Sequence, residues 1–156
     1  MEVSFDDWKR QGREVLYRPV VAESVAFEAR PRPEVRAERA DIQAGTAQIL
    51  DVRTAEEYRG EDPASARPGH IPGAKHIPWL EFVSQQGTLF RDPAELRDVL
   101  GSASVDAEEP IIAYCRTGIR ATVPYLALQR LGRTVEVYAG SFAEWISDPG
   151  ASVETT

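Results

Sequence analysis

Short apolar runs alternate with capped, amphipathic segments along most of this chain. The apolar runs predict buried strands at 47–52, 111–114 and 135–138. Helix-start patterns, in which a Ser, Thr or Asp cap precedes a Glu by three positions, occur at 54–57, 92–95 and 141–144. A further helix is expected from about residue 120 to residue 131, ended by Gly132. Such alternation is typical of an α/β fold with a mainly parallel central sheet and helices on both faces.

Two stretches carry no regular pattern. Residues 61–78 contain four prolines and two glycines, so we expect an ordered loop there without helix or strand. The first 40 residues contain Pro19, Pro31 and Pro33 among mixed charges, which indicates an extended linker. Before that linker, residues 4–8 echo residues 141–145, because both begin with Ser-Phe and end with Trp. We therefore expect a short helix at the start of the chain.

Composition narrows the classes of partner and location. The chain has 156 residues and a net charge of −7, which disfavours nucleic acid and anionic membrane as partners because both require a broad basic surface. No apolar stretch approaches the roughly 20 residues that span a bilayer. The first residues lack the pattern of a signal peptide, so a cytoplasmic location is expected. With one cysteine and two histidines, we expect no metal site and no cofactor.

That single cysteine, Cys115, lies where a predicted strand ends and a predicted helix begins. A thiol at such a junction meets unpaired backbone N–H groups and the positive end of a helix, which together stabilise an anion. Arg116 and Arg120 should act in the same direction, so we interpret Cys115 as a nucleophile. The alternative is that Cys115 is a small buried apolar residue without a chemical role. The two neighbouring arginines argue against this alternative, because an inert buried thiol does not require nearby positive charge.

Four segments, taken in order, resemble one known family. The loop 115–120 resembles the active-site loop of the rhodanese (thiosulfate sulfurtransferase) family, and the supporting segments are 50–60, 69–74 and 138–145. The pattern is most similar to the carboxyl-terminal, catalytic half of two-domain sulfurtransferases. The resemblance implies a rhodanese-like catalytic domain at 35–156. It also implies that residues 1–34 are an N-terminal helix and extended linker resembling the remnant of a preceding domain.

The resemblance also implies a reaction and a set of site residues. Cys115 would take the outer sulfur of thiosulfate as a persulfide and pass it to cyanide or a thiol acceptor. The loop would bind the anionic donor through Arg116, Thr117, Gly118, Ile119 and Arg120. Gly118 allows a tight turn, and the backbone N–H groups of 116–120 would surround the sulfur.

Four further residues are expected near the site in structural roles. Asp51 and Arg53 should lock their strand to neighbouring loops, and His70 should be a hydrogen-bonded turn residue rather than a proton donor. Glu57 stands where two-domain relatives commonly carry a substrate-binding arginine, so the use of carboxylate donors such as mercaptopyruvate is doubtful. Glu57 can also be explained as the partner of Thr54 in a capping box. Phe142 is expected near the mouth of the pocket.

Other functions remain as alternatives. Cysteine phosphatases and arsenate reductases use a Cys-x5-Arg loop, whereas here the sixth residue after Cys115 is Ala121, which favours sulfur transfer. A second alternative is a carrier module that accepts a persulfide from one protein and delivers it to another. An apolar face left bare by a missing domain could also pair two chains, so a homo-oligomer is a further expectation.

Overall fold

A five-stranded parallel sheet forms the centre of the protein. The computed structural model describes residues 5–85 and 89–156. The strands are β1 (Arg36–Ala37), β2 (Gln48–Asp51), β3 (Lys75–His76), β4 (Ile111–Tyr114) and β5 (Val135–Tyr138). They lie in the order β1-β5-β4-β2-β3, and every neighbouring pair is parallel. This arrangement confirms the predicted α/β fold and puts β4 in the middle of the sheet.

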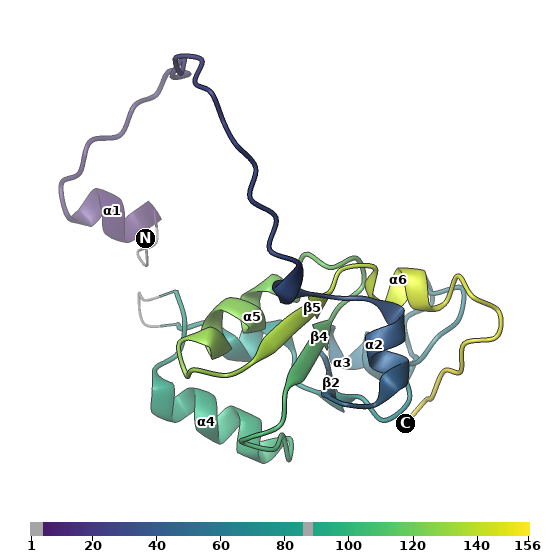
Figure 1. Ribbon diagram of the computed structural model, residues 1–156. Coiled ribbons are helices and arrows are strands. Elements are labelled where there is room, and N and C mark those ends of the chain that lie inside the picture. Colours follow the sequence, from purple (N-terminus) through teal and green to yellow (C-terminus); the bar gives the residue numbers. More distant parts are fainter. Residues whose placement is uncertain (1–4, 86–88) are drawn as a thin grey trace.

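Helices cover both faces of this sheet (Figure 1). On one face lie η2 (Trp79–Phe82), α4 (Pro93–Ser102) and α5 (Thr122–Gln129), whose apolar side chains share a core cluster with β2 and β4. On the other face lie α2 (Arg39–Ala44), α3 (Ala55–Arg59) and α6 (Ser141–Trp145), which bury a second cluster. All four residues of β4 are buried, as expected for a strand covered on both faces.

Capping explains where two of the helices begin. Thr54 accepts a hydrogen bond from the N–H of Glu57 at the start of α3, and Asp92 accepts from Ala94 and Glu95 at the start of α4. Both capping boxes are confirmed. The capping box predicted at 141–144 is wrong, because Ser141 is itself the first residue of α6 and has φ 54°. Its hydroxyl group is used elsewhere, at the candidate site.

Three short elements lie inside stretches for which no regular structure was predicted. β1 and α2 fall within or beside the expected linker, and β3 falls within the proline-rich loop 61–78. β1 and β3 have two residues each, too few to produce a hydrophobic period, and they exist through pairing with β5 and β2. Glu38 precedes α2 as its N-cap residue, and its N–H donates to the Asp41 carboxylate. Glu is not among the residues preferred at the N-cap, so the sequence pattern gave no signal for this helix.

The N-terminal segment stands away from this body. It comprises α1 (Phe5–Arg10), an extended chain without helix or strand, and η1 (Pro33–Val35). Figure 1 shows α1 at the far end of this arm. A helix thus follows Ser4, which is the first residue of the predicted helix start and lies outside the described residues. In the described part of the chain, no helix has the length and apolar character needed to cross a membrane.

Candidate active site

Cys115 follows β4 directly, at the carboxyl end of the central strand. Parallel sheets bind ligands beyond this edge, because loops from several strands meet there. The segment after β2 contributes Arg53 and, within α3, Glu57, and the start of α6 after β5 contributes Ser141 and Phe142. The predicted nucleophile therefore lies where the sheet topology brings distant segments together.

The turn after β5 holds the start of the Cys115 loop in place. The N–H groups of Phe142 and Ala143 donate to the carbonyl oxygens of Cys115 and Arg116, both at 3.0 Å. The Ser141 hydroxyl donates to the Tyr138 carbonyl at 2.8 Å and accepts from the N–H of Cys115 at 3.2 Å. The first turn of α6 thus fixes the backbone at the start of the loop.

The loop curls around the sulfur atom. The N–H of Gly118 donates to Cys115 Sγ at 3.2 Å. Gly118 has φ +90°, and a Cβ atom there would stand 2.6 Å from the carbonyl oxygen of Ala139, so both its conformation and its surroundings require glycine. Elsewhere in 116–120, the backbone N–H groups have no acceptor among the described residues. Such a ring of unpaired donors can hold an anion.

Cys115 is nevertheless deeply placed. The residue is 1% exposed, and it contributes to the apolar cluster beneath α4 and α5. Its Sγ atom still faces the loop, since the amide of Gly118 reaches it. The thiol is therefore a buried group whose Sγ atom contacts the loop at the N–H of Gly118.

Both arginines of the loop form ion pairs with residues outside it. Arg120 donates from Nη1 and Nη2 to the two carboxylate oxygens of Glu57, at 2.7 and 2.8 Å. Arg116 donates to Asp62 at 3.0 Å and to the backbone of Ala64 at 3.3 Å. These pairs differ from the expectation that both guanidinium groups are free to hold the donor. In sequence, each partner is more than 50 positions away from its arginine.

Electrostatics strengthen the pair between Arg120 and Glu57. The hydrogen bond and charge of Glu57 raise the pKa of Arg120, and the nearby Cys115 acts in the same direction. Burial alone would raise the pKa of Glu57, but hydrogen bonds from Arg120 and Thr54 and the charges of Arg120 and Arg53 lower it overall. Glu57 also forms the predicted capping box with Thr54, so one carboxylate serves both roles.

A buried network joins β2 to β4 and to the loop 69–71. Arg53 donates to both Asp51 oxygens at 2.6–3.0 Å and to the Gly69 carbonyl at 2.7 Å. The Tyr114 hydroxyl donates to Asp51 at 2.6 Å and accepts from the N–H of Ile71 at 3.1 Å. These bonds are the strand-to-loop connections expected of Asp51 and Arg53. Asp51 is fully buried, and its oxygens are occupied.

His70 makes its contacts in a turn. Its Nδ1 atom lies 2.8 Å from the carbonyl oxygen of Tyr58, and the two rings stack with centroids 3.8 Å apart. Its backbone pairs with Glu154 near the C-terminus. This geometry agrees with a hydrogen-bonded turn residue, and no interaction with Cys115 occurs among the described contacts.

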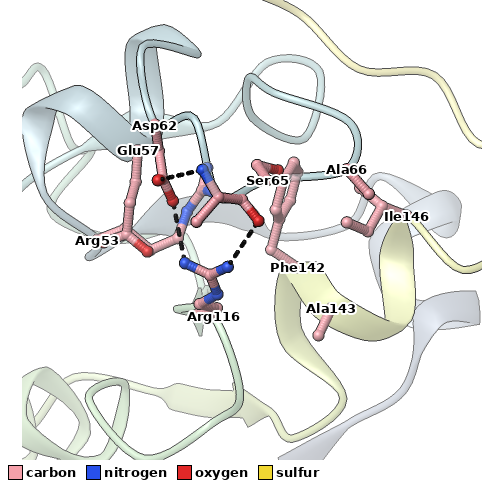
Figure 2. A pocket seen from close by; sticks show the side chains of 10 residues that line it. Arg53, Glu57, Asp62, Ser65, Ala66, Arg116, Phe142, Ala143 and Ile146 are labelled. Atoms are coloured by element: carbon pink, nitrogen blue, oxygen red, sulfur yellow. Dashed lines mark hydrogen bonds and ion pairs between the residues drawn. The ribbon is translucent and has the colours of Figure 1, made fainter.

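A cavity of about 210 Å³ lies beside the loop (Figure 2). Arg116 reaches into it and bridges to Asp62 and to the backbone of Ala64, within the segment 62–66 that forms one wall. Phe142 forms part of another wall, as expected, and the guanidinium of Arg53 lies 4.0 Å from the centre of its ring. The cavity is thus both apolar and charged, and it reaches the Cys115 loop at Arg116.

Two residues at the site were not predicted. Asp62 precedes Pro63 in an irregular loop, and no local pattern connects it with Arg116. The sequence predicts Ser141 as a helix cap, whereas its hydroxyl accepts a hydrogen bond from the N–H of Cys115. In the described part of the chain, no cluster of His, Cys, Asp and Glu could hold a metal ion.

Solved structures share this fold. The structure resembles EanB in a persulfide form with ergothioneine, at a TM-score of 0.88 and 23% identity, covering 99% of this chain and 41% of that chain. It is also similar to the anaerobic ergothioneine biosynthesis enzyme of Chlorobium limicola, at a TM-score of 0.87 and 24% identity, covering 99% of this chain and 40% of that chain. At such identities the likeness concerns the fold alone.

Sequence relatives point to one family. A putative thiosulfate sulfurtransferase of Mycolicibacterium smegmatis is 36% identical over 98% of this chain and 61% of its own length. One of Haloferax volcanii is 37% identical over 80% of this chain and 47% of its own length. The chain thus spans about half to three fifths of these curated relatives. Residues 36–148 match the Rhodanese-like domain, and the chain belongs to the rhodanese family.

Proposed function

We propose that this protein is a sulfurtransferase that moves the outer sulfur of thiosulfate to cyanide or a thiol through a persulfide on Cys115. The observation that carries the proposal is the Gly118 N–H bound to Cys115 Sγ, in a loop whose other backbone N–H groups have no acceptor among the described residues. The names of the relatives, putative thiosulfate sulfurtransferases, support the same donor.

The chemistry balances with no group beyond donor and acceptor. The Cys115 thiolate attacks the outer sulfur, a new S–S bond forms, and sulfite leaves with the electrons of the bond that breaks. Cyanide then attacks the outer sulfur of the persulfide, so that thiocyanate leaves and the thiolate is restored. Both enzyme forms are anions, with the charge on Sγ in the thiolate and on the added outer sulfur in the persulfide, and preorganised N–H donors of the loop would stabilise both.

The residues around the loop have supporting roles in this proposal. Gly118 and the amides of 116–120 bind the sulfur anion, and Thr117 and Ile119 supply backbone donors at the exposed rim of the loop. Arg116 borders the cavity through which a donor or acceptor would approach. Asp51 and Arg53 hold the neighbouring loops in position and take no part in the chemistry.

A second candidate is a persulfide carrier for a partner protein. The paired state of Arg116 and Arg120 favours it, because a free thiosulfate dianion meets no unpaired guanidinium in the loop. A kcat/KM for thiosulfate of about 10⁴ M⁻¹ s⁻¹ or more would identify an ordinary enzyme. A far lower value together with rapid transfer from a protein persulfide would identify the carrier. Action in the cytoplasm, without nucleic acid or membrane, is part of either proposal.

The direct test is turnover of thiosulfate with cyanide. The wild-type protein should form thiocyanate, and Cys115→Ser should form none. Hydrolysis of an aryl phosphate without thiocyanate formation would reject sulfur transfer in favour of phosphatase activity.

A further inference from the structure

Charge at the Cys115 loop is balanced rather than positive. Glu57 accepts from both terminal nitrogens of Arg120, and Asp62 accepts from Arg116. Buried Arg53 is likewise paired with Asp51. A bidentate pair is strong and directional, so the guanidinium of Arg120 is both oriented and neutralised by its partner.

Glu57 cannot easily release Arg120. Its side chain is 10% exposed, and that of Arg120 is 27% exposed. The same carboxylate accepts from the N–H of Thr54 at 3.0 Å, while the Thr54 hydroxyl accepts from the N–H of Glu57 at 3.3 Å. A swing of the carboxylate away from Arg120 would therefore disrupt the first turn of α3 as well as the ion pair.

Arg120 lies two residues after Gly118, whose N–H binds Cys115 Sγ, and its guanidinium is held by Glu57. Cys115 also helps to raise the pKa of Arg120. Glu57 also lines the cavity beside the loop. A negative group on a donor in this region meets a guanidinium whose charge is cancelled, and at close range it meets the carboxylate of Glu57. The number of negative charges on the donor should therefore affect its binding.

We propose that Glu57 is a positioning and specificity residue, which orients Arg120 beside Cys115 and cancels its charge, so that the site discriminates against donors with an additional negative group. This inference rests on the proposed sulfur transfer and names its donor class. Thiosulfate is still a donor in this proposal, but as a dianion it binds more weakly than a donor with a single negative charge on the sulfur-bearing group. Donors that also carry a carboxylate are disfavoured as well.

The test compares donors that differ in charge. Wild type, Glu57→Gln and the control Glu56→Gln are assayed with methanethiosulfonate, a monoanion, and thiosulfate, a dianion. Glu56 is exposed and makes no contact with Arg120 among the described interactions, so its substitution controls for a lost surface charge. Glu57→Gln should raise the ratio of kcat/KM for thiosulfate to that for methanethiosulfonate about tenfold, through a lower KM for thiosulfate. Glu56→Gln should leave the ratio within about twofold of wild type.

Two further measurements separate specificity from folding. Arg120→Gln leaves the charge of Glu57 uncancelled, so it should lower the same ratio about tenfold. Alkylation of Cys115 needs no sulfur transfer, and Glu57→Gln should raise the rate with iodoacetate relative to iodoacetamide. Glu57→Asp keeps the charge but shortens the reach, so it should keep the donor ratio of wild type while lowering kcat.

The possible failures are distinct. If the wild type turns over both donors but neither Glu57→Gln nor Arg120→Gln moves the donor ratio, the inference is overturned and the proposed function stands. If the wild type turns over neither donor and its mass is unchanged by thiosulfate, both are rejected.

Discussion

Replacing Gly118 by alanine tests the geometry of the amide ring. Alanine at φ +90° carries the cost of a left-handed conformation, about 1–2 kcal/mol. Its Cβ would also stand 2.6 Å from the Ala139 carbonyl oxygen, a backbone atom that can move only with the turn after β5. Crowding of this kind costs about 1–3 kcal/mol. We expect Gly118→Ala to lower the free energy of unfolding by about 2–5 kcal/mol.

Gly132→Ala is the matched control. Gly132 has φ +73°, and a Cβ atom there would have no neighbour within 4 Å, so only the conformational cost of about 1–2 kcal/mol remains. Unfolding in guanidinium chloride, monitored by circular dichroism, measures both variants. The difference between them isolates the contact with Ala139.

Activity should separate the two glycine variants further. The N–H of Gly118 binds the sulfur, so a displaced loop should lower thiosulfate turnover about 10²-fold, whereas Gly132→Ala should retain wild-type turnover. Equal stability of the two variants, together with full activity of Gly118→Ala, would refute the close approach to Ala139 and the role of the loop geometry.

Three more predictions concern the supports of the site. Tyr114→Phe removes a buried hydroxyl that donates to Asp51 and accepts from the N–H of Ile71. The free energy of unfolding should therefore fall by about 1–3 kcal/mol, and an unchanged urea titration would contradict this. Because its pairing with Arg120 lowers the pKa of Glu57, the carboxylate stabilises the fold above about pH 4.3 and loses this effect as pH falls through the lowered value. The stability difference between wild type and Glu57→Gln should therefore shrink in acid, and a pH-independent difference would argue against the ion pair. Residues 5–30 make several side-chain hydrogen bonds and ion pairs with one another. Removal of residues 1–30 should therefore change stability by less than about 0.5 kcal/mol, and loss of the cooperative transition would contradict an independent 35–156 unit.

That truncation also bears on self-association. Several large apolar side chains of the extended arm are exposed, among them Tyr17, Val21 and Phe27. Exposed apolar groups of this kind favour contact with another surface. If the arm pairs two chains, sedimentation should show a dimer for the full chain and a monomer for the truncated one.

Local patterns predicted much of the fold. Alternation of apolar runs with capping residues indicated β2, β4, β5 and most of the helices, because these signals depend on neighbours in the sequence. The sequence did not predict β1 and β3, because a strand of two residues is too short to show a hydrophobic period. Each forms by pairing with a strand that lies far away in the sequence. The start of α5 at Thr122, rather than near 120, reflects the residues used by the loop.

The residues of the candidate site also divide into those that local sequence predicts and those that it does not. Cys115 and Gly118 could be identified from the strand-to-helix junction and the resemblance, and the structure places them in contact. The partners of the arginines could not, since Glu57 and Asp62 meet them only after the sheet has formed. The hydroxyl of Ser141 was assigned to a helix cap because local spacing carries no information about the distant N–H of Cys115.

The most direct measurement is the intact mass of the protein after treatment with thiosulfate and removal of excess donor. The account predicts a gain of one sulfur atom on the wild type, its loss on addition of cyanide, and no gain on Cys115→Ser. An unchanged wild-type mass, with Cys115 also inert to alkylation, would contradict the account and assign this 1% exposed thiol to the core.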